Sequence, residues 1–261
     1  MVGLITLSKE NVVDYVKSRL NFFNLNGDIK VSAIGEGSVE EDGDGFINFV
    51  YRVSDGEHHL IVKQSTRSKG SFTLDLNRYK LEYDAMKICA AIVPDLIPKL
   101  YDCDEENRVF ITEDVSYLRI SRFQLLKGVT YPKLADQIAR YMAATQFYTS
   151  EYYLDTKRFR DLSVHFMNTT MRKIMEVGMF LTSVTPEDTV GRPLDPEFVT
   201  FSKRICADPA VLLARQKLRH LFMSKGECLI HCDLHTSNIF ASQTEAKVID
   251  MEYAFFGPFA Y

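Results

Sequence analysis

Two neighbouring stretches with strand-like patterning restrict the fold of this chain more than any other sequence feature. Large apolar residues occupy every second position from Ile47 to Val53, which is the side-chain period of a β-strand. The residues Ser-Asp-Gly at 54–56 favour a turn, and residues 58–64 have the composition of a second strand. The sequence therefore predicts a β-hairpin in the first quarter of the chain.

The segments around this hairpin predict further strands and two helices. Residues at near-helical spacing follow Ser8, which predicts a first helix capped by this serine. Apolar residues at spacings of three and four predict a helix over 75–92. Two more strands are expected at 99–103 and 108–113, on either side of an acidic turn.

The pattern becomes helical after Glu113. Short apolar runs at 228–232 and 246–249 lie near the end of the chain, and residues 184–197, with three prolines, are expected to form a surface loop. Long periodic stretches predict helices at 132–149, 162–180 and 208–223.

A strand-rich part followed by a helix-rich part is typical of an α+β fold with two lobes. We expect a small N-terminal lobe with an antiparallel β-sheet at 1–112, a hinge at 113–116 and a mainly helical C-terminal lobe at 117–261. The total length of 261 residues agrees with two such units.

Composition and charge exclude several classes of protein. The chain is 46% hydrophobic and 25% charged, as globular proteins are. Its net charge is -4 and no basic stripe is visible, so we expect no nucleic-acid partner. No apolar run reaches the ~18 residues that span a bilayer, so no membrane partner is expected either. Five cysteines, an odd number, favour the reducing cytoplasm.

Polar residues beside the two last apolar runs indicate phosphoryl transfer. This reaction needs a carboxylate that deprotonates a hydroxyl and oxygen ligands for Mg²⁺. Asp233, after the first run, is predicted as the catalytic base. Asn238, Asp250 and Glu252 are predicted as the metal ligands.

A lysine and two glycines in the N-terminal part complete this pattern. Lys63 lies in an otherwise apolar strand and therefore requires an acidic partner, for which Glu82 on the next helix is the candidate. Phosphoryl transfer also needs a cation on the phosphates. Gly43 and Gly45 would allow the backbone to approach a triphosphate, because they carry no Cβ.

Each of these features also has a simpler structural explanation. Lys63 alone could be a strand residue with a solvated tip, and the glycines of 35–45 could be turn residues. Asp250 and Glu252 could cap a turn, although their offset from Asn238 favours metal binding. A zinc site is a further alternative, because four potential ligands have the spacing i, i+3, i+4 and i+7 and would share one face of a helix: Cys228, His231, Cys232 and His235. The apolar residues Leu229 and Ile230 favour a strand that runs into a loop instead.

The order of these residues resembles that of the protein-kinase-like superfamily. The spacing from His231 to Asp233 and Asn238, followed by Asp250, is similar to its catalytic and metal loops. The pattern His-Cys-Asp-Leu-His at 231–235 resembles the branch that includes aminoglycoside phosphotransferases and choline kinases. Four ordered matches are similar to 5-methylthioribose kinases in particular: Gly43–Asn48, Glu113–Ser116, Asp233–Thr236 and Asp250–Pro258.

This resemblance implies an ATP-dependent kinase that converts 5-methylthioribose to its 1-phosphate in methionine salvage. It implies Asp233 and His235 as contacts of a small sugar substrate, with ATP and Mg²⁺ as cofactors and a possible homodimer. The residues implied to bind the nucleotide are Gly43, Asp44, Gly45, Phe46, Asn48, Lys63, Glu82, Glu113, Asp114, Val115, Asp250, Met251 and Glu252.

The chain departs from the family pattern at three positions. Phe46 replaces the usual Asn, Cys232 replaces Gly, and Asn238 stands where Ser is frequent. Family members also continue well beyond the Gly-Pro pair, so we expect the C-terminal lobe to be incomplete here. Two alternatives remain open: a kinase for another hydroxylated small molecule, such as an aminoglycoside or choline, and a nucleotide-binding pseudokinase without turnover.

Overall fold

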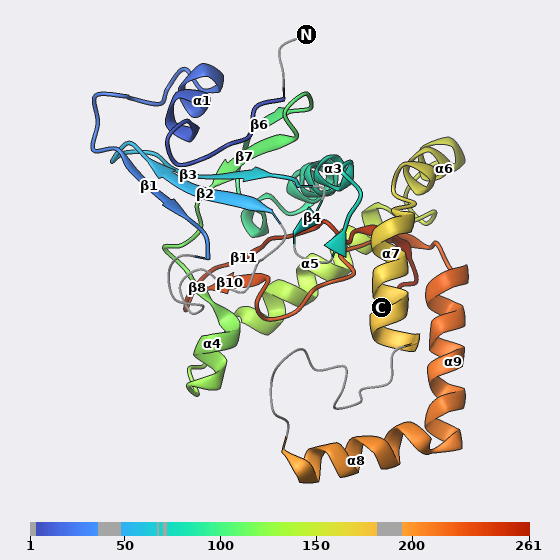
Figure 1. Ribbon diagram of the computed structural model, residues 1–261. Coiled ribbons are helices and arrows are strands. Elements are labelled where there is room, and N and C mark those ends of the chain that lie inside the picture. The colour runs from blue at the N-terminus through green and yellow to red at the C-terminus, as the bar shows by residue number, and fades with distance from the viewer. Residues whose placement is uncertain (1–3, 36–47, 67, 70–71, 182–194) are drawn as a thin grey trace.

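The structure is a computed structural model that describes residues 4–35, 48–66, 68–69, 72–181 and 195–261. A twisted sheet with two helices forms the upper part in Figure 1, and helices with short strands form the lower part. The predicted α+β fold with an N-terminal antiparallel sheet is confirmed.

The N-terminal sheet has five strands in the order β1-β2-β3-β7-β6, all antiparallel. The predicted hairpin is the β2–β3 pair, in which Tyr51 lies opposite Val62. The bounds of the strands are β1 (Lys30–Ala33), β2 (Phe49–Ser54), β3 (His59–Gln64), β6 (Leu100–Asp104) and β7 (Val109–Glu113). Alternation along β3 buries Leu60 and Val62 completely, which is why the period of two was visible in the sequence.

Helix α1 (Val12–Arg19) covers this sheet with Val12 and Val16, which are fully buried. The predicted cap by the Ser8 side chain is wrong. The helix begins after Asn11, and no side chain caps it; the Ser8 carbonyl accepts from the Val12 N–H at 3.0 Å instead. The chain turns back before the helix because the Asn11 side chain accepts from the Ser8 N–H at 2.8 Å.

Helix α3 (Arg78–Ile92) lies between the two parts of the molecule (Figure 1). Its buried residues Tyr79, Met86 and Cys89 pack in the same apolar core as residues of the C-terminal strands. The turn η1 (Pro94–Leu96) follows it, and the two-residue strands β4 (Ser68–Lys69) and β5 (Phe72–Thr73) precede it.

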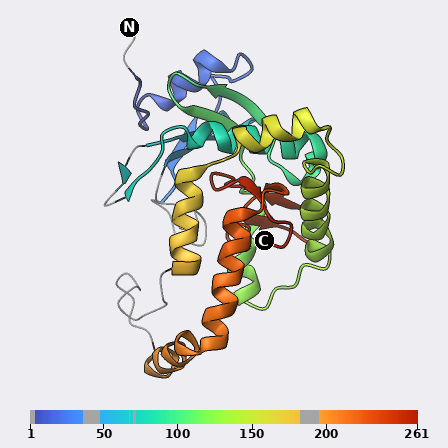
Figure 2. The same cartoon turned by 90° about the vertical axis from the view of Figure 1, so that its right-hand side faces the viewer.

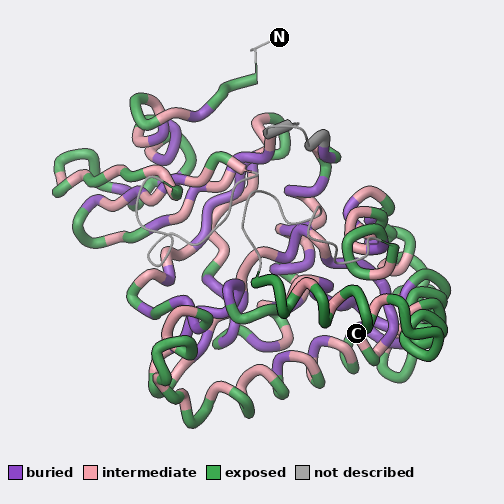
Figure 3. Tube along the Cα trace, turned by 60° about the horizontal axis from the view of Figure 1, so that its bottom comes forward, coloured by how far each residue is buried: buried purple, intermediate pink, exposed green. Residues whose placement is uncertain are grey.

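The helices of the C-terminal part are α4 (Ser121–Leu126), α5 (Leu134–Tyr148), α6 (Thr156–His165), α7 (Thr169–Glu176), α8 (Pro196–Ala207) and α9 (Pro209–Ser224), with a π-turn η2 (Val177–Leu181) after α7. Helices α7 and α9 lie side by side (Figures 1 and 2). Figure 3 shows that buried backbone is concentrated at the centre of the molecule, and no described residue of α8 is buried.

Two sequence predictions in this region are wrong. The helix expected over 162–180 is divided, because Asn168 has a left-handed backbone with φ of 40°. Its amide donates to the carbonyls of Glu252 and Ala254, at 2.9 Å each, which holds the break in place. The loop expected over 184–197 ends earlier than predicted: Asp195 caps α8 by accepting from the Glu197 N–H. Residues 182–194 lie outside the described residues.

Short strands of the C-terminal part form two small sheets near the N-terminal sheet. Strands β8 (Arg119–Ile120), β10 (Ile239–Ala241) and β11 (Ala246–Val248) form one sheet, and β9 (Cys228–Ile230) pairs with β12 (Phe255–Gly257). The loops that follow β9 and β11 therefore come together below the large sheet. No helix among the described residues is both long and apolar enough to cross a membrane.

Candidate functional site

A cleft of about 340 Å³ lies between the N-terminal sheet and the short C-terminal strands. Two loops supply many of its polar residues: the 231–238 loop, which follows β9, and the 249–254 loop, which follows β11. The predicted residues that line the cleft are Asn48, Lys63, Glu82, Glu113, Asp114, Val115, Asp233, His235, Asn238, Asp250 and Glu252.

His231 joins the two loops. Its Nε2 lies 2.9 Å from the Ile249 carbonyl, and its Nδ1 accepts from the Asp233 N–H at 3.3 Å. These contacts require a neutral ring that is protonated on Nε2. Burial lowers the pKa of His231 and favours that neutral form. The ring therefore fixes the separation between the 231–238 loop and the 249–254 loop.

Asp233 is held by Asn238 from the same loop. The Asn238 amide donates to the Asp233 backbone carbonyl at 2.9 Å and to its Oδ2 at 3.3 Å. Burial, reinforced by the charge on Asp250, raises the pKa of Asp233 above its usual value. His235 is half exposed, with Nε2 3.6 Å from Asp233 Oδ2. A partly desolvated carboxylate in a cleft is suited to accept a proton.

Lys63 connects both lobes through two carboxylates. Its ammonium lies 2.8 Å from Glu82 Oε1 on α3 and 2.6 Å from Asp250 Oδ1 in the 249–254 loop. Burial alone would lower the pKa of Lys63, but Asp250, Glu82 and Glu252 outweigh it and raise that pKa. Burial would raise the pKa of Asp250, and Lys63 outweighs it and lowers that pKa. Both groups are therefore charged near neutral pH.

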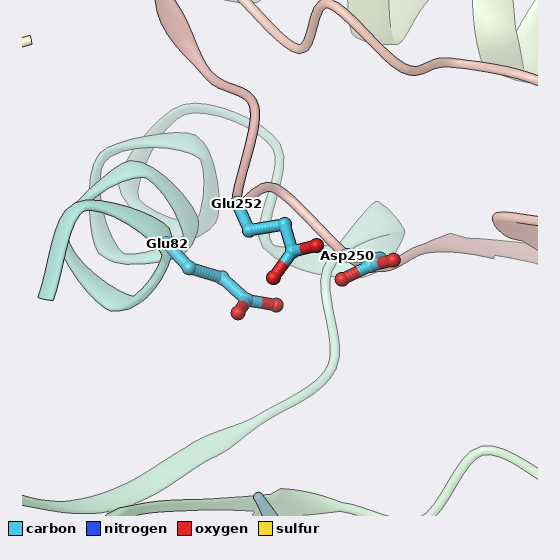
Figure 4. Close-up of side chains that lie close together, drawn as sticks. All are labelled: Glu82, Asp250 and Glu252. Atoms are coloured by element: carbon cyan, nitrogen blue, oxygen red, sulfur yellow. The ribbon is translucent and has the colours of Figure 1, made fainter. Parts of the chain in front are cut away.

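Three carboxyl groups lie close together, as Figure 4 shows. Oxygens of Glu82, Asp250 and Glu252 lie within 4.8 Å of one another. Burial raises the pKa of Glu82 to about 8; Lys63 opposes this shift and Asp250 reinforces it. Glu82 Oε2 is buried without a hydrogen-bond partner among the described residues. Hard oxygen donors with excess negative charge fit a cation such as Mg²⁺.

Glu252 has two neighbours that sequence reasoning did not bring together. Its Oε2 accepts from Arg78 Nε and from Asn48 Nδ2, at 3.2 Å each. Arg78 was missed altogether, because one arginine at the start of a helix has no periodic signal that marks it. Only its position one turn before Glu82 could have indicated that the two residues lie on the same face of the helix.

The other end of the cleft is apolar and ends at the predicted hinge. The Glu113 and Asp114 N–H groups donate to the carbonyls of Lys99 and His59, at 2.8 and 3.0 Å. The Val115 N–H makes no hydrogen bond among the described residues. Apolar residues also line the cleft, namely Ile34, Val50, Ile61, Met86, Phe110, Ile120, Phe240 and Ile249. A flat apolar ring with an acceptor at its edge would fit here.

Some predicted residues lie elsewhere. The side chain of Met251 is buried in the apolar core, so only its backbone is near the cleft. Gly43, Asp44, Gly45 and Phe46 lie outside the described residues. Both polar atoms of the Asn48 amide make hydrogen bonds: Oδ1 accepts from Arg78, and Nδ2 donates to Glu252.

The zinc alternative finds no support among the described residues. Cys228 is in strand β9 and His231 in the loop that follows, so the helical spacing does not place the four side chains on one face. The group of Glu82, Asp250 and Glu252 is the one set of potential metal ligands that converges in the described part of the chain.

Comparison with known proteins identifies methylthioribose kinases as relatives. The chain is 34% identical over 264 aligned residues to the methylthioribose kinase of Bacillus cereus, an alignment that covers 100% of this chain and 64% of the relative. The methylthioribose kinase of Bacillus anthracis matches with the same identity and coverage. The chain thus spans 64% of the length of these curated relatives.

Among solved structures, an ethanolamine kinase from Plasmodium vivax is similar with a TM-score of 0.54 and 16% sequence identity. This similarity covers 100% of the chain and 68% of that structure, and it shows the kinase-like fold. No family model matches the sequence. The predicted resemblance to methylthioribose kinases is thereby confirmed.

Proposed function

From the homology of this chain to methylthioribose kinases along its whole length, we propose that it carries the nucleotide site and the catalytic loop of an ATP-dependent sugar kinase. The favoured reaction phosphorylates 5-methylthioribose on its anomeric hydroxyl. One observation carries the proposal: Lys63, Asp233, Asp250 and Glu252 line a single cleft although they come from three separate segments.

The nucleotide would lie along the cleft with its base at the hinge. The apolar walls would enclose adenine, and the Val115 N–H, which has no partner among the described residues, would donate to the ring. Residues 1–112 would then form the nucleotide-binding lobe, 113–116 the hinge and 117–261 the lobe that carries the catalytic residues. Lys63 at the opposite end would contact the phosphates.

Asp250 and Glu252, together with Asn238, would hold Mg²⁺. When bound, the ion would neutralise charge on the phosphates during transfer. The amide oxygen of Asn238 supports this assignment, because it makes no hydrogen bond among the described residues and lines the cleft. Lys63 keeps Asp250 ionised, and an ionised carboxylate is the form that binds a cation.

Asp233 would orient the acceptor hydroxyl and take its proton. The hydroxyl oxygen forms a bond to the γ-phosphorus while the bond from that phosphorus to the β–γ bridging oxygen breaks, and ADP leaves. Asn238 keeps the Asp233 carboxylate in place during this step. His235, half exposed beside Asp233, would contact the sugar at the open side of the cleft.

The test compares wild-type protein with Asp233→Asn, both produced from the complete reading frame that encodes this chain. We expect turnover of 5-methylthioribose to fall by about 10²–10⁴-fold while ATP affinity is kept. Asp161→Asn on the surface of α6 is the matched control and should keep full turnover. Retained turnover in Asp233→Asn would refute the role of Asp233 as base.

A panel of acceptors scored by ADP release distinguishes the alternatives. Strict preference for methylthioribose supports the favoured substrate, and preference for choline or an aminoglycoside supports a sister kinase. Thermal stabilisation by Mg²⁺-ATP without ADP release from any acceptor would identify a pseudokinase. The position of Cys232, with φ of 65° beside Asp233, is the observation that keeps this last candidate in view.

A further inference from the structure

Arg78 is the largest fully buried side chain among the described residues, with 0% of its surface exposed. Each of its three nitrogens donates. Nε lies 3.2 Å from Glu252 Oε2, and Nη2 lies 2.5 Å from Asn48 Oδ1. Nη1 donates to the Thr66 and Asp75 carbonyls, at 2.8 and 3.0 Å. The guanidinium thus joins four segments of chain at one point.

Asn48 completes a closed triangle with Arg78 and Glu252. Its Oδ1 accepts from Arg78, and its Nδ2 donates to the same Glu252 oxygen that Arg78 contacts. Asn48 immediately precedes strand β2 and Arg78 begins helix α3, whereas Glu252 belongs to the 249–254 loop of the other lobe. The triangle therefore fixes the 249–254 loop against two elements of the N-terminal lobe.

The two donors leave the Glu252 carboxylate with one occupied and one available oxygen. Oε2 accepts both hydrogen bonds, and Oε1 makes none among the described residues. Only 3% of the Glu252 surface is exposed, so the surrounding protein restricts rotation of the carboxylate. Glu252 also belongs, with Glu82 and Asp250, to the group of three carboxylates whose oxygens converge (Figure 4).

We infer that Arg78 and Asn48 are positioning residues that orient the Glu252 carboxylate for metal binding. This inference rests on the proposed function, which makes Glu252 a metal ligand. Hydrogen bonds to a ligating carboxylate fix its orientation, and losing them typically weakens metal affinity 10–100-fold. A planar guanidinium can serve Asn48 and Glu252 at once, whereas a lysine ammonium offers no such fixed fork.

The experiment measures binding of Mn²⁺, a spectroscopic substitute for Mg²⁺, to the full protein in the presence of ADP, so no turnover is involved. Electron paramagnetic resonance of free Mn²⁺ gives the dissociation constant. We expect Arg78→Lys to raise this constant 10–100-fold and to leave the affinity for ADP without metal unchanged. Tyr15→Phe is the control, because it removes a buried hydrogen bond to Asp104 in the same lobe, away from the cleft.

A second variant keeps the test decisive if Arg78→Lys fails to fold. Asn48→Ala leaves the arginine in place and should weaken Mn²⁺ binding several-fold. In a Glu252→Gln background, Asn48→Ala should cause no further change in Mn²⁺ affinity, because the carboxylate that Asn48 orients is gone. Effects that simply add in the double variant would overturn the inference.

The remaining outcomes separate the two proposals. Unchanged Mn²⁺ affinity in both Arg78→Lys and Asn48→Ala, even with a lower melting temperature, would overturn the positioning role alone. Wild-type protein that binds Mn²⁺ and ADP but phosphorylates no acceptor would overturn the proposed kinase activity and leave the positioning role standing. Wild-type protein without metal-dependent ADP binding would overturn both.

Discussion

The Lys63 ammonium lies 2.6 Å from Asp250 Oδ1, although 187 positions separate the two residues in the chain. The same ammonium contacts Glu82 at 2.8 Å. One ammonium thus contacts a carboxyl group from each lobe. The side chain of Glu82 is 2% exposed and that of Asp250 is 32% exposed, so the pair with Glu82 is the more strongly desolvated of the two.

Replacing Lys63 by Met should destabilise the protein and abolish phosphate binding. The change leaves Asp250, which is ionised near neutral pH, beside Glu82 and Glu252 without its cation, and breaking a buried pair costs about 3–5 kcal/mol. The partial exposure of Asp250 places the expected loss near the lower end of that range. Urea unfolding at pH 7 and ATP titration measure the two effects.

The double variant Lys63→Met with Asp250→Asn is the companion test. Neutralising Asp250 should restore part of the lost stability, because one uncompensated charge is removed, but it should not restore ATP binding. A single Lys63→Met variant as stable as wild type would show that the two contacts contribute nothing to folding.

Replacing His231 by Leu should separate the two loops that the ring joins. The Ile249 carbonyl loses its donor, at a cost of about 1–3 kcal/mol. We also expect turnover to fall by up to ~100-fold, because a small displacement of Asp233 spoils its alignment. Steady-state kinetics and chemical unfolding report the two losses, and wild-type values for both would contradict the bridging role.

The stability gap between wild type and His231→Leu should depend on pH. Burial lowers the folded-state pKa of His231 below 6.5, so the unfolded chain binds more protons as pH falls. The stabilisation by the neutral ring is therefore complete above pH 6.5 and declines below it. Unfolding free energies at pH 5.5 and pH 8 should show the smaller gap at pH 5.5.

Cys232→Gly should be close to neutral. Cys232 has φ of 65°, a left-handed conformation that costs an L-residue about 1–2 kcal/mol. Glycine removes this strain but also removes a buried side chain from the apolar cluster that includes Phe222 and Phe255. The two effects oppose each other, so we expect a change in unfolding free energy within about 1 kcal/mol and retained turnover. Loss of folding would show that the packing of the thiol dominates.

Asp55→Asn should weaken the β2–β3 turn at neutral pH. Its carboxylate accepts from the Asn24, Glu57 and His58 N–H groups and from the His58 ring. Burial would raise the pKa of Asp55, but these donors outweigh it and lower that pKa. Losing charge-assisted hydrogen bonds of this kind costs about 2–3 kcal/mol at pH 7.

The stability of wild type and Asp55→Asn at acidic pH tests this explanation. A depressed folded-state pKa stabilises the protein above the unfolded value of 3.8, and the benefit disappears as pH falls toward the folded value. The difference between wild type and Asp55→Asn should therefore narrow below pH 3.8. Melting temperatures at pH 7 and pH 3 measure it, and a constant difference would rule out the ionised carboxylate as its source.

Elements with a strong period were predictable from the sequence. The β2–β3 hairpin, helix α3 and the β6–β7 pair occur where alternation or helical spacing indicated them. A lysine in a buried strand needs a partner, and that requirement alone indicated Glu82, which lies in contact with it.

Features that depend on tertiary contacts were not predictable. Strands β8, β10 and β12 have two or three residues each, which is too short for alternation to be recognised. The break between α6 and α7 depends on contacts from Asn168 to carbonyls more than 80 positions away, and no local signal records them. Arg78 was missed for the same reason, since its partners come from other segments.

The pairing of β8 with β10 anchors the chain just after residues 113–116, which we propose to act as the hinge. Ile120, a few residues after Val115, pairs with Phe240, and the Ser121 hydroxyl donates to the Thr236 carbonyl at 2.8 Å. The chain is thus held by contacts with the C-terminal lobe within a few residues after position 116. A change in the angle between the two lobes would therefore be taken up within residues 113–118. It would also have to break the Lys63–Asp250 contact and the hydrogen bonds that Arg78 and Asn48 donate to Glu252.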